Sequence, residues 1–181
     1  VPLDGEKNNC PLLSVEAIRG TLKTVRQCKI DVTNNSSRYV LHNPRTYTLG
    51  GAYADPLSPR IKPSSSGAAV VSKTLYTGRG FSGVFTYDLL DSSTRQPSER
   101  LAVFFKVPYD LNIRKNEYAV GLLDVARECD ENLYKHMATD LTVVRGQAKG
   151  PSLTFTGKDV TIRATMSENH APVIKVDLDD D

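Results

Sequence analysis

The chain has 181 residues, 39% of them hydrophobic, which is enough for one domain to bury a core without disulfide support. Its formal net charge is only +2, and no dense Lys/Arg cluster is interleaved with aromatic residues, so we expect no nucleic-acid partner. No apolar run approaches the roughly 20 residues of a membrane-spanning helix. We therefore expect a soluble resting protein whose membrane contacts are peripheral or follow a conformational change.

Cysteines and sequons bear on the compartment. The chain begins at Val1, which is consistent with a processed, secreted protein or with a trimmed sequence. The odd set of Cys10, Cys28 and Cys129 allows one bridge and a free thiol, and we favour a Cys10–Cys28 link. Buried thiols acting as small hydrophobic residues are the open alternative. Overlapping glycosylation sequons at Asn34 and Asn35 give weak support to secretion.

The N-terminal region divides into an arm and a helix. Residues 1–13 are predicted to form an extended arm, because Pro, Gly and Asn recur there. Residues 14–27 are predicted to form an amphipathic helix that begins at Ser14 as the N-cap. Its apolar residues at helical spacing are Val15, Ile18, Leu22 and Val25. In a resting protein such a stripe packs on the rest of the fold.

Strands are predicted for most of the remaining chain. Alternating residues at 29–32 and 39–41 predict a hairpin around the Asn/Ser loop 34–37. The Pro-rich stretch 43–67 predicts short edge strands and turns. Further strands are predicted at 68–74, 83–90, 101–107, 118–123, 152–156, 160–166 and 173–178.

A second helix and an acidic end complete the prediction. Residues 126–138 have helical spacing with an acidic first turn, and residues 177–181 suggest a solvated tail. The expected fold class is mainly β: a two-sheet β-sandwich flanked by two short α-helices. Residues 14–181 would form a single domain.

The segment from Leu101 to Val120 resembles the signature of one family. An apolar strand ends in Val-Pro-Tyr-Asp-x-Asn, and its frame residues are Val107, Pro108, Tyr109, Asp110, Asn112 and Asn116. This pattern is similar to that of the actinoporins, pore-forming cytolysins built on a compact β-sandwich of the cytolysin-lectin type. The segments 83–89, 127–130, 157–160 and 162–166 extend the resemblance, which is strongest to the fish-type and other non-anemone members.

The resemblance implies a lipid-headgroup site. Family members cage the quaternary ammonium of phosphocholine lipids between aromatic faces, by cation–π attraction. The corresponding positions are Lys106, Pro108, Ile113, Arg114, Glu117, Tyr118 and Tyr134, which retain few aromatic residues. This predicts weak phosphocholine binding by a degenerate site, and the two cations favour a phosphate or another anionic headgroup instead. A charged rim without a ligand is the alternative interpretation.

The resemblance also implies that the helix bearing Val15, Ile18, Leu22 and Val25 inserts into membranes, with a homo-oligomer forming there. A helix from Leu13 to Gln27 would span roughly 22 Å, which is less than a hydrocarbon core of roughly 30 Å, so pore lining would require the arm to refold.

Enzymatic functions are not indicated. His42, His136 and His170 are scattered, and no metal-binding, nucleophile-elbow or phosphate-loop spacing is present. We read Gly78-Arg79-Gly80 as a turn. We expect no catalytic residues, no metal and no cofactor.

The sequence thus predicts a secreted, soluble protein that associates with target membranes, with membrane lipids or a glycan as its partner. Pore formation is a further expectation from the resemblance. The alternatives are a non-lytic lectin-like or protein-recognition module on the same sandwich, and a structural extracellular protein.

Overall fold

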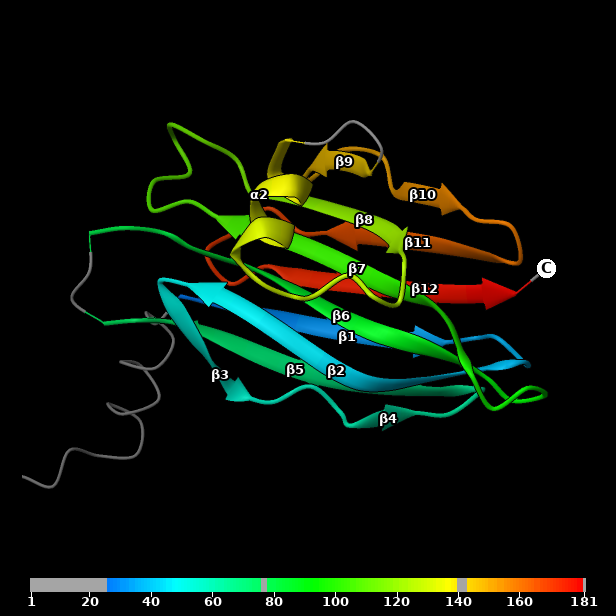
Figure 1. The fold of residues 1–181 in the computed structure, drawn as a ribbon. Helices are drawn as coiled ribbons and strands as arrows, with labels where there is room; N and C mark the ends of the chain where they lie inside the picture. The colour runs from blue at the N-terminus through cyan, green and yellow to red at the C-terminus, as the bar shows by residue number, and fades with distance from the viewer. Residues whose placement is uncertain (1–25, 76–77, 140–142, 181) are drawn as a thin grey trace, which may run out of the picture.

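Two six-stranded sheets form the body of the protein (Figure 1). The computed structural model describes residues 26–75, 78–139 and 143–180. Sheet A has the order β10 (Leu153–Thr156), β11 (Val160–Met166), β12 (Val173–Asp180), β1 (Gln27–Asn34), β5 (Ser65–Lys73) and β3 (Gly51–Asp55). Sheet B has the order β4 (Arg60–Ile61), β2 (Tyr39–Leu49), β6 (Phe81–Asp91), β7 (Pro97–Val107), β8 (Glu117–Leu123) and β9 (Val144–Gln147). The predicted two-sheet sandwich is confirmed.

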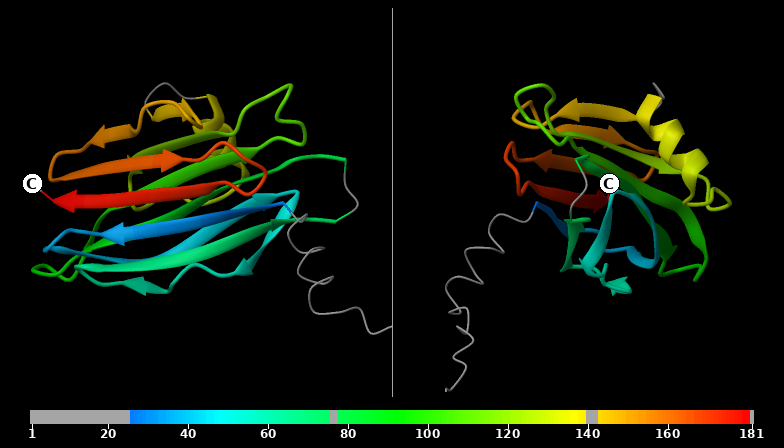
Figure 2. Two further views of the ribbon diagram at one scale, coloured as in Figure 1. Left: turned by 180° about the vertical axis from the view of Figure 1, so that it is seen from behind. Right: turned by 90° about the vertical axis from the view of Figure 1, so that its left-hand side faces the viewer.

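The main core lies between the two sheets, which are stacked as separate layers in the end-on view of Figure 2. Alternate residues of β1 supply it, because successive strand side chains point to opposite faces: Cys28, Ile30 and Val32 are at most 1% exposed. In β6 every residue but Leu90 is buried, and in β7 every residue of 100–107 but Lys106 is buried. These two central strands are therefore covered on both faces, by sheet A on one side and by a helix on the other.

That helix is α2 (Glu131–Thr139), which lies on the outer face of sheet B (Figure 1). Leu133 and Met137 face inward and form a second core with Val84 and Phe104 of the sheet. This apolar spacing is what predicted a helix here. Since the second core fixes α2 on the sheet, the position of Tyr134 on the same helix is fixed as well.

The predicted helix 126–138 begins five residues later than expected. The Asp130 carboxylate accepts a hydrogen bond from the backbone N–H of Leu133, at 3.0 Å, and so acts as the N-cap. The backbone carbonyl of Arg127 accepts a hydrogen bond from the Arg100 guanidinium instead of taking part in a helical turn. A contact from a distant strand thus holds residues 126–130 in a loop.

The predicted hairpin 29–41 is wrong in its pairing. β1 and β2 belong to different sheets, and β1 pairs with β12 in parallel and with β5 antiparallel. Asn34, at the corner, is fully buried, and its side-chain amide donates to the backbone carbonyls of Tyr39 and Ile61. The sequon at Asn34 is therefore a structural corner and not an accessible acceptor, whereas Asn35 is exposed.

Several predictions concern the two ends of the chain. The arm 1–13 lies outside the described residues, and so does the helix 14–27 except for its last two residues; Gln27 begins β1. Cys28 is a free thiol and is fully buried, and burial raises its pKa to about 12. This agrees with the alternative of a buried thiol and not with the favoured Cys10–Cys28 bridge. The acidic end forms strand β12 as far as Asp180, which accepts hydrogen bonds from Ser37.

Candidate functional site

One end of the sandwich, at the left of Figure 1, gathers the loops that contain the predicted site. Cross-strand register aligns Leu49 of β2 with Ser82 of β6, Ser82 with Lys106 of β7, and Lys106 with Glu117 of β8. Sheet A joins this end where the backbone N–H of Thr74 donates to the Gly50 carbonyl, at 2.9 Å. We call this the loop end; it comprises the turn at Gly50, the loop after β5 and the β7–β8 loop 108–116.

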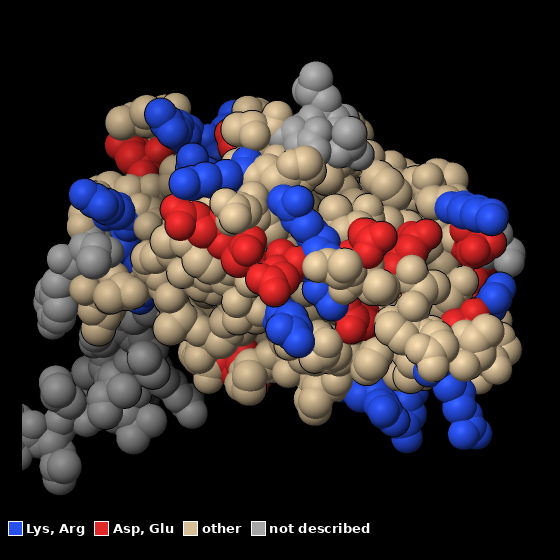
Figure 3. All heavy atoms as spheres, in the orientation of Figure 1, with Lys and Arg blue, Asp and Glu red and all other residues tan. Residues whose placement is uncertain are grey.

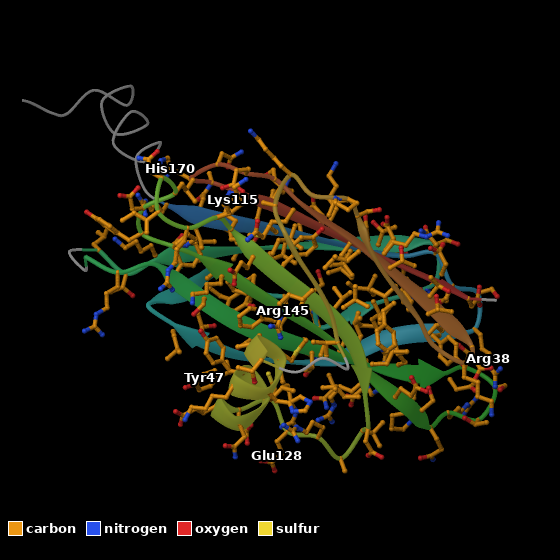
Figure 4. All side chains as sticks on the ribbon, turned by 90° about the horizontal axis from the view of Figure 1, so that it is seen from above. Arg38, Tyr47, Lys115, Glu128, Arg145 and His170 are labelled. Carbon is orange, nitrogen blue, oxygen red and sulfur yellow. The ribbon has the colours of Figure 1, made fainter. Side chains whose placement is uncertain are left out.

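Figure 4 distinguishes the two ends of the sandwich. Lys115 of the β7–β8 loop and His170 of the β11–β12 loop lie at the loop end, whereas Arg38 lies at the opposite end. The chain leaves β12 at that opposite end (Figure 1). The loop end is therefore free of the C-terminal strand end and of the β1–β2 corner.

The β7–β8 loop takes its shape from Asp110. Its carboxylate accepts a hydrogen bond from the Asn112 N–H at 2.9 Å, and its carbonyl accepts from the N–H groups of Ile113 and Arg114 at 3.2 and 3.1 Å. Asp is suited to this position because its short side chain bonds its own backbone two residues on. The turn holds Ile113 outward, with 77% of its surface exposed, and Arg114 beside it.

Two contacts fix this loop to its surroundings. A Cβ on Gly80 would lie 2.2 Å from the Val107 carbonyl and 2.8 Å from Cα of Pro108, so only glycine permits the β5–β6 loop to approach so closely. This approach places Arg79 beside Pro108. At the other side, the buried amide of Asn116 donates to the carbonyl of Asn169 in the β11–β12 loop, at 3.0 Å.

A cavity of about 290 Å³ lies between the β5–β6 and β7–β8 loops. It is lined by Arg79, Gly80, Phe81, Ser82, Lys106, Val107, Pro108, Tyr109 and Arg114. Arg79 and Arg114 are exposed, Lys106 is half-buried, and no acidic side chain lines the cavity. Within the described ranges, none of these three cations belongs to an ion pair. We call this cavity the basic pocket.

Tyr109, half-exposed on the rim of the basic pocket, already has cationic partners. The guanidinium carbon of Arg26 and Nζ of Lys73 each lie 4.8 Å from the centre of its ring. Arg26 also donates to the Pro108 carbonyl at 3.2 Å. Burial, and then the charge of Arg26, lower the pKa of Lys73.

The other predicted aromatic residues do not line the basic pocket. Tyr134 packs against Tyr47 and Phe104, with ring centres 5.9 and 5.4 Å away, and its hydroxyl lies 2.8 Å from Oγ of Ser82. Tyr118 is 1% exposed and its hydroxyl donates a hydrogen bond to the Ala164 carbonyl, so it belongs to the core. The prediction that Tyr118 lies at the headgroup face is therefore wrong.

The remaining predicted site residues lie around the basic pocket. Lys106, Pro108 and Arg114 line it, Ile113 projects beside it, and Glu117 lies on β8 opposite Lys106 without lining it. Sequence reasoning missed Arg79 and Ser82 as pocket residues. The Gly-Arg-Gly turn was visible, but its contact with Pro108 depends on two strands separated in sequence.

The exposed large apolar side chains share a location. Among the described residues they are Leu49, Leu75, Tyr109 and Ile113, with exposures of 43%, 61%, 50% and 77%. The register and the loop contacts place all four at the loop end. These four side chains, which lie at the same end as the basic pocket, are called the apolar rim.

Elsewhere, a polar hollow lies over the outer face of sheet A, lined by Asp31, Thr33, Ser66, Gly67, Ala68, Lys175 and Asp177. No group of three or more His, Cys, Asp or Glu side chains suited to a metal ion occurs in the part of the chain that the structure describes. Within that part, no helix has the length and apolarity to cross a membrane.

The chain resembles known proteins in sequence and in fold. The family model described as sea anemone cytotoxic protein matches residues 15–179. The solved structure of the lipid binding protein Nakanori is 10% identical, with a TM-score of 0.66, covering 90% of this chain and 75% of that one. The Xerocomus chrysenteron lectin XCL is 14% identical, with a TM-score of 0.51, covering 84% and 99% respectively. No curated protein matches the chain.

Proposed function

We propose that the protein binds membrane lipid through the loop end of its sandwich, because the chain belongs to the sea anemone cytotoxic protein family, the actinoporins. The name of Nakanori as a lipid binding protein supports the same function on a similar fold. The proposal concerns docking on a membrane surface, which needs no conformational change in the described residues.

The apolar rim is the observation that carries the proposal. Leu49, Leu75, Tyr109 and Ile113 are the large apolar side chains that stand exposed within the described ranges, and they lie at one end. Each CH₂ group moved from water into lipid contributes about 0.8 kcal/mol. An exposed apolar rim beside cations is the combination that holds a protein at the interface of a bilayer.

Vesicle co-sedimentation of the double variant Leu75→Gln, Ile113→Gln tests this proposal. We expect it to bind at least tenfold more weakly than wild type, since two exposed apolar side chains no longer enter the interface. Val40→Gln is the matched control, because it changes a half-exposed apolar residue of β2 away from the loop end. Unchanged binding by the double variant would contradict docking through this end.

Pore formation is a finer proposal that rests on the N-terminal segment. Its apolar residues Val15, Ile18, Leu22 and Val25 lie outside the described residues, and their insertion remains a prediction. A variant Ile18→Asp, Leu22→Asp should then keep vesicle binding and lose dye release from the same vesicles. Joint loss of both would mean that the segment serves docking, and dye release without change would exclude the segment from the pore.

Other predicted properties stay predictions. They are secretion, solubility, a homo-oligomer on membranes, a degenerate phosphocholine site and the glycan-binding alternative. The similarity to the lectin concerns the fold. Binding to a glycan array without any binding to vesicles would favour the lectin-like function over the one proposed.

A further inference from the structure

We infer that the basic pocket binds the phosphate of a net-anionic phospholipid headgroup and discriminates against a quaternary ammonium. The inference rests on the proposed function, because it assigns the headgroup class to the loop end. It follows from the charges that line the pocket and from the contacts that already occupy the neighbouring aromatic rings.

The lining of the basic pocket suits an anion. Arg79 approaches from the β5–β6 loop, Lys106 from the end of β7 and Arg114 from the turn at Asp110. Each is without an ion-pair partner within the described ranges. Guanidinium and ammonium groups donate charge-assisted hydrogen bonds to phosphate oxygens, and guanidinium does so in a bidentate manner. Three cationic residues that line one pocket can therefore share one phosphate group.

The aromatic surface near the pocket is unsuited to a quaternary ammonium. Tyr109 already interacts with Arg26 and Lys73, each 4.8 Å from its ring centre. A choline group would have to displace one of these cations and would then meet the charge of the other. Tyr134 is held by its contacts with Tyr47 and Phe104. No aromatic cage for a cation remains among the described residues that line the pocket.

Two acidic residues near the basic pocket, Asp110 and Glu117, do not line it. Asp110 uses its carboxylate to accept the Asn112 N–H and does not line the pocket. Glu117 lies opposite Lys106 in the strand pair and offsets part of its charge, but it is outside the pocket lining. Figure 3 shows several Lys and Arg side chains together with some acidic atoms at the loop end, and further acidic side chains across the middle of the same face.

The apolar rim identifies a lipid as the source of the phosphate. Ile113 and Arg114 are consecutive in the turn, so an apolar side chain that enters the bilayer interface brings a guanidinium to the level of the headgroups. Leu75 projects from the neighbouring loop with 61% of its surface exposed. A soluble phosphate compound would make no use of these apolar side chains.

The test compares full-length wild type with Arg79→Gln, Lys106→Gln and Arg114→Gln. Co-sedimentation is measured on vesicles of phosphatidylcholine alone and of phosphatidylcholine with phosphatidic acid. Wild type should bind the second kind several-fold more tightly. Each substitution should weaken that binding about fivefold, since a basic residue near an anionic surface contributes about 1 kcal/mol. Circular dichroism confirms that each variant is folded.

Lys158→Gln is the matched control, because it removes the same charge from an exposed turn between β10 and β11, at the opposite end. If it weakened binding as much as the pocket variants, the attraction would be diffuse and the inference overturned. Equal binding of wild type to both kinds of vesicle would overturn the inference while leaving the proposed function intact. Failure to bind either kind would contradict the proposed function itself.

Inorganic phosphate separates the lipid from a soluble ligand. Isothermal titration with inorganic phosphate should give weak binding to wild type, and phosphate should compete only partly with phosphatidic acid vesicles, because the apolar rim contributes the rest. Tight binding of phosphate together with no binding to vesicles would assign the basic pocket to a soluble phosphate compound and overturn the lipid source.

Discussion

Asn34 shows how one side chain can connect the two sheets at the corner after β1. Its amide donates to the carbonyls of Tyr39 and Ile61 at 2.8 and 3.1 Å, and its oxygen accepts from the N–H and hydroxyl of Ser36. Asn34 is fully buried, so water cannot replace these bonds. The residue joins strands of sheet B to the end of β1 in sheet A.

We expect Asn34→Ala to lower the free energy of unfolding by about 1–3 kcal/mol, because it leaves buried carbonyl groups unsatisfied. Urea unfolding followed by circular dichroism measures this loss. Asn35→Ala, at the neighbouring exposed position, is the control and should change stability by less than about 0.5 kcal/mol. Equal effects at both positions would show that the corner does not depend on Asn34.

Asp91 makes stability depend on pH. Hydrogen bonds from Arg38, at 2.7 and 3.0 Å, and then from Ser93 hold the pKa of the Asp91 carboxyl well below its usual range. A depressed pKa stabilises the fold above the unfolded-state value of about 3.9, and this stabilisation is lost as the pH falls through the folded-state pKa. Asp91 thus contributes to stability at neutral pH and progressively less in acid.

Asp91→Asn should therefore lower the melting temperature at neutral pH and make its decline below about pH 4 less steep. Thermal unfolding across that range provides the measurement, and Asp55→Asn, at an exposed position of β3, is the control. A variant with the same acid decline as wild type would show that other carboxyl groups dominate the acid response.

At the residue scale, the motif led further than strand patterns did. The Pro-Tyr-Asp turn predicted Pro108 and Arg114 for one site, and both residues line the basic pocket. Tyr118 was misplaced because a motif does not specify which strand face a side chain occupies. Its neighbour Glu117 pairs with Lys106 at the edge of the site, so Tyr118, one residue on, must point to the opposite face and enter the core.

At the scale of elements, the loop before α2 is held by a buried ion pair. Nε of Arg100 lies 2.6 Å from the Asp88 carboxylate, and both side chains are less than 10% exposed. The same guanidinium donates to the Arg127 carbonyl, while Asn43 donates to Asp88 at 3.0 Å. Strands β2, β6 and β7 and the loop 124–130 thus share one polar cluster.

Arg100→Met should destabilise the protein by about 3–5 kcal/mol, because it leaves the Asp88 carboxylate buried without its partner. Guanidinium chloride unfolding measures the loss. The double variant Arg100→Met, Asp88→Leu serves as the control: it removes both charges and should recover most of the stability. No recovery in the double variant would mean that the contact with Arg127 matters more than the ion pair.

Local pattern predicted most elements but not their partners. Alternation located β11 and β12 to within a few residues, since half-buried strands carry that period. Apolar runs located β6 and β7, which are covered on both faces. The hairpin 29–41 was wrong because β1 is surrounded by β12 and β5, whose sequences lie far away. The start of α2 was wrong for the same reason: Arg100, on β7, takes the carbonyl that would have begun it.

At the scale of the whole molecule, β1 is an inner strand of sheet A, and the described sandwich begins with it. β1 occupies an inner position of sheet A, between β12 and β5, and contributes three core side chains. Deletion of residues 1–25 should therefore leave a folded sandwich with a cooperative thermal transition. Deletion of residues 1–34 should abolish folding, because sheet A would lose its central pairing.

Circular dichroism and one-dimensional NMR of both truncations check this expectation. A molten or aggregated product from the shorter deletion would show that the N-terminal segment is part of the folding unit. Retained folding after the longer deletion would show that β5 and β12 can pair directly. Vesicle binding by the shorter deletion would also assign docking to the sandwich alone.

The parallel pairing of β1 with β12 has a mechanical consequence. The two strands run side by side with Lys29 beside Val173 and Asn34 beside Leu178, so the chain enters at the loop end and leaves at the other end. A force that pulled these two ends apart would load all the hydrogen bonds between the strands in shear at once, whereas peeling would break them one by one. A sandwich anchored to a surface by its loop end and pulled at the end of β12 should resist extension as a single rigid unit.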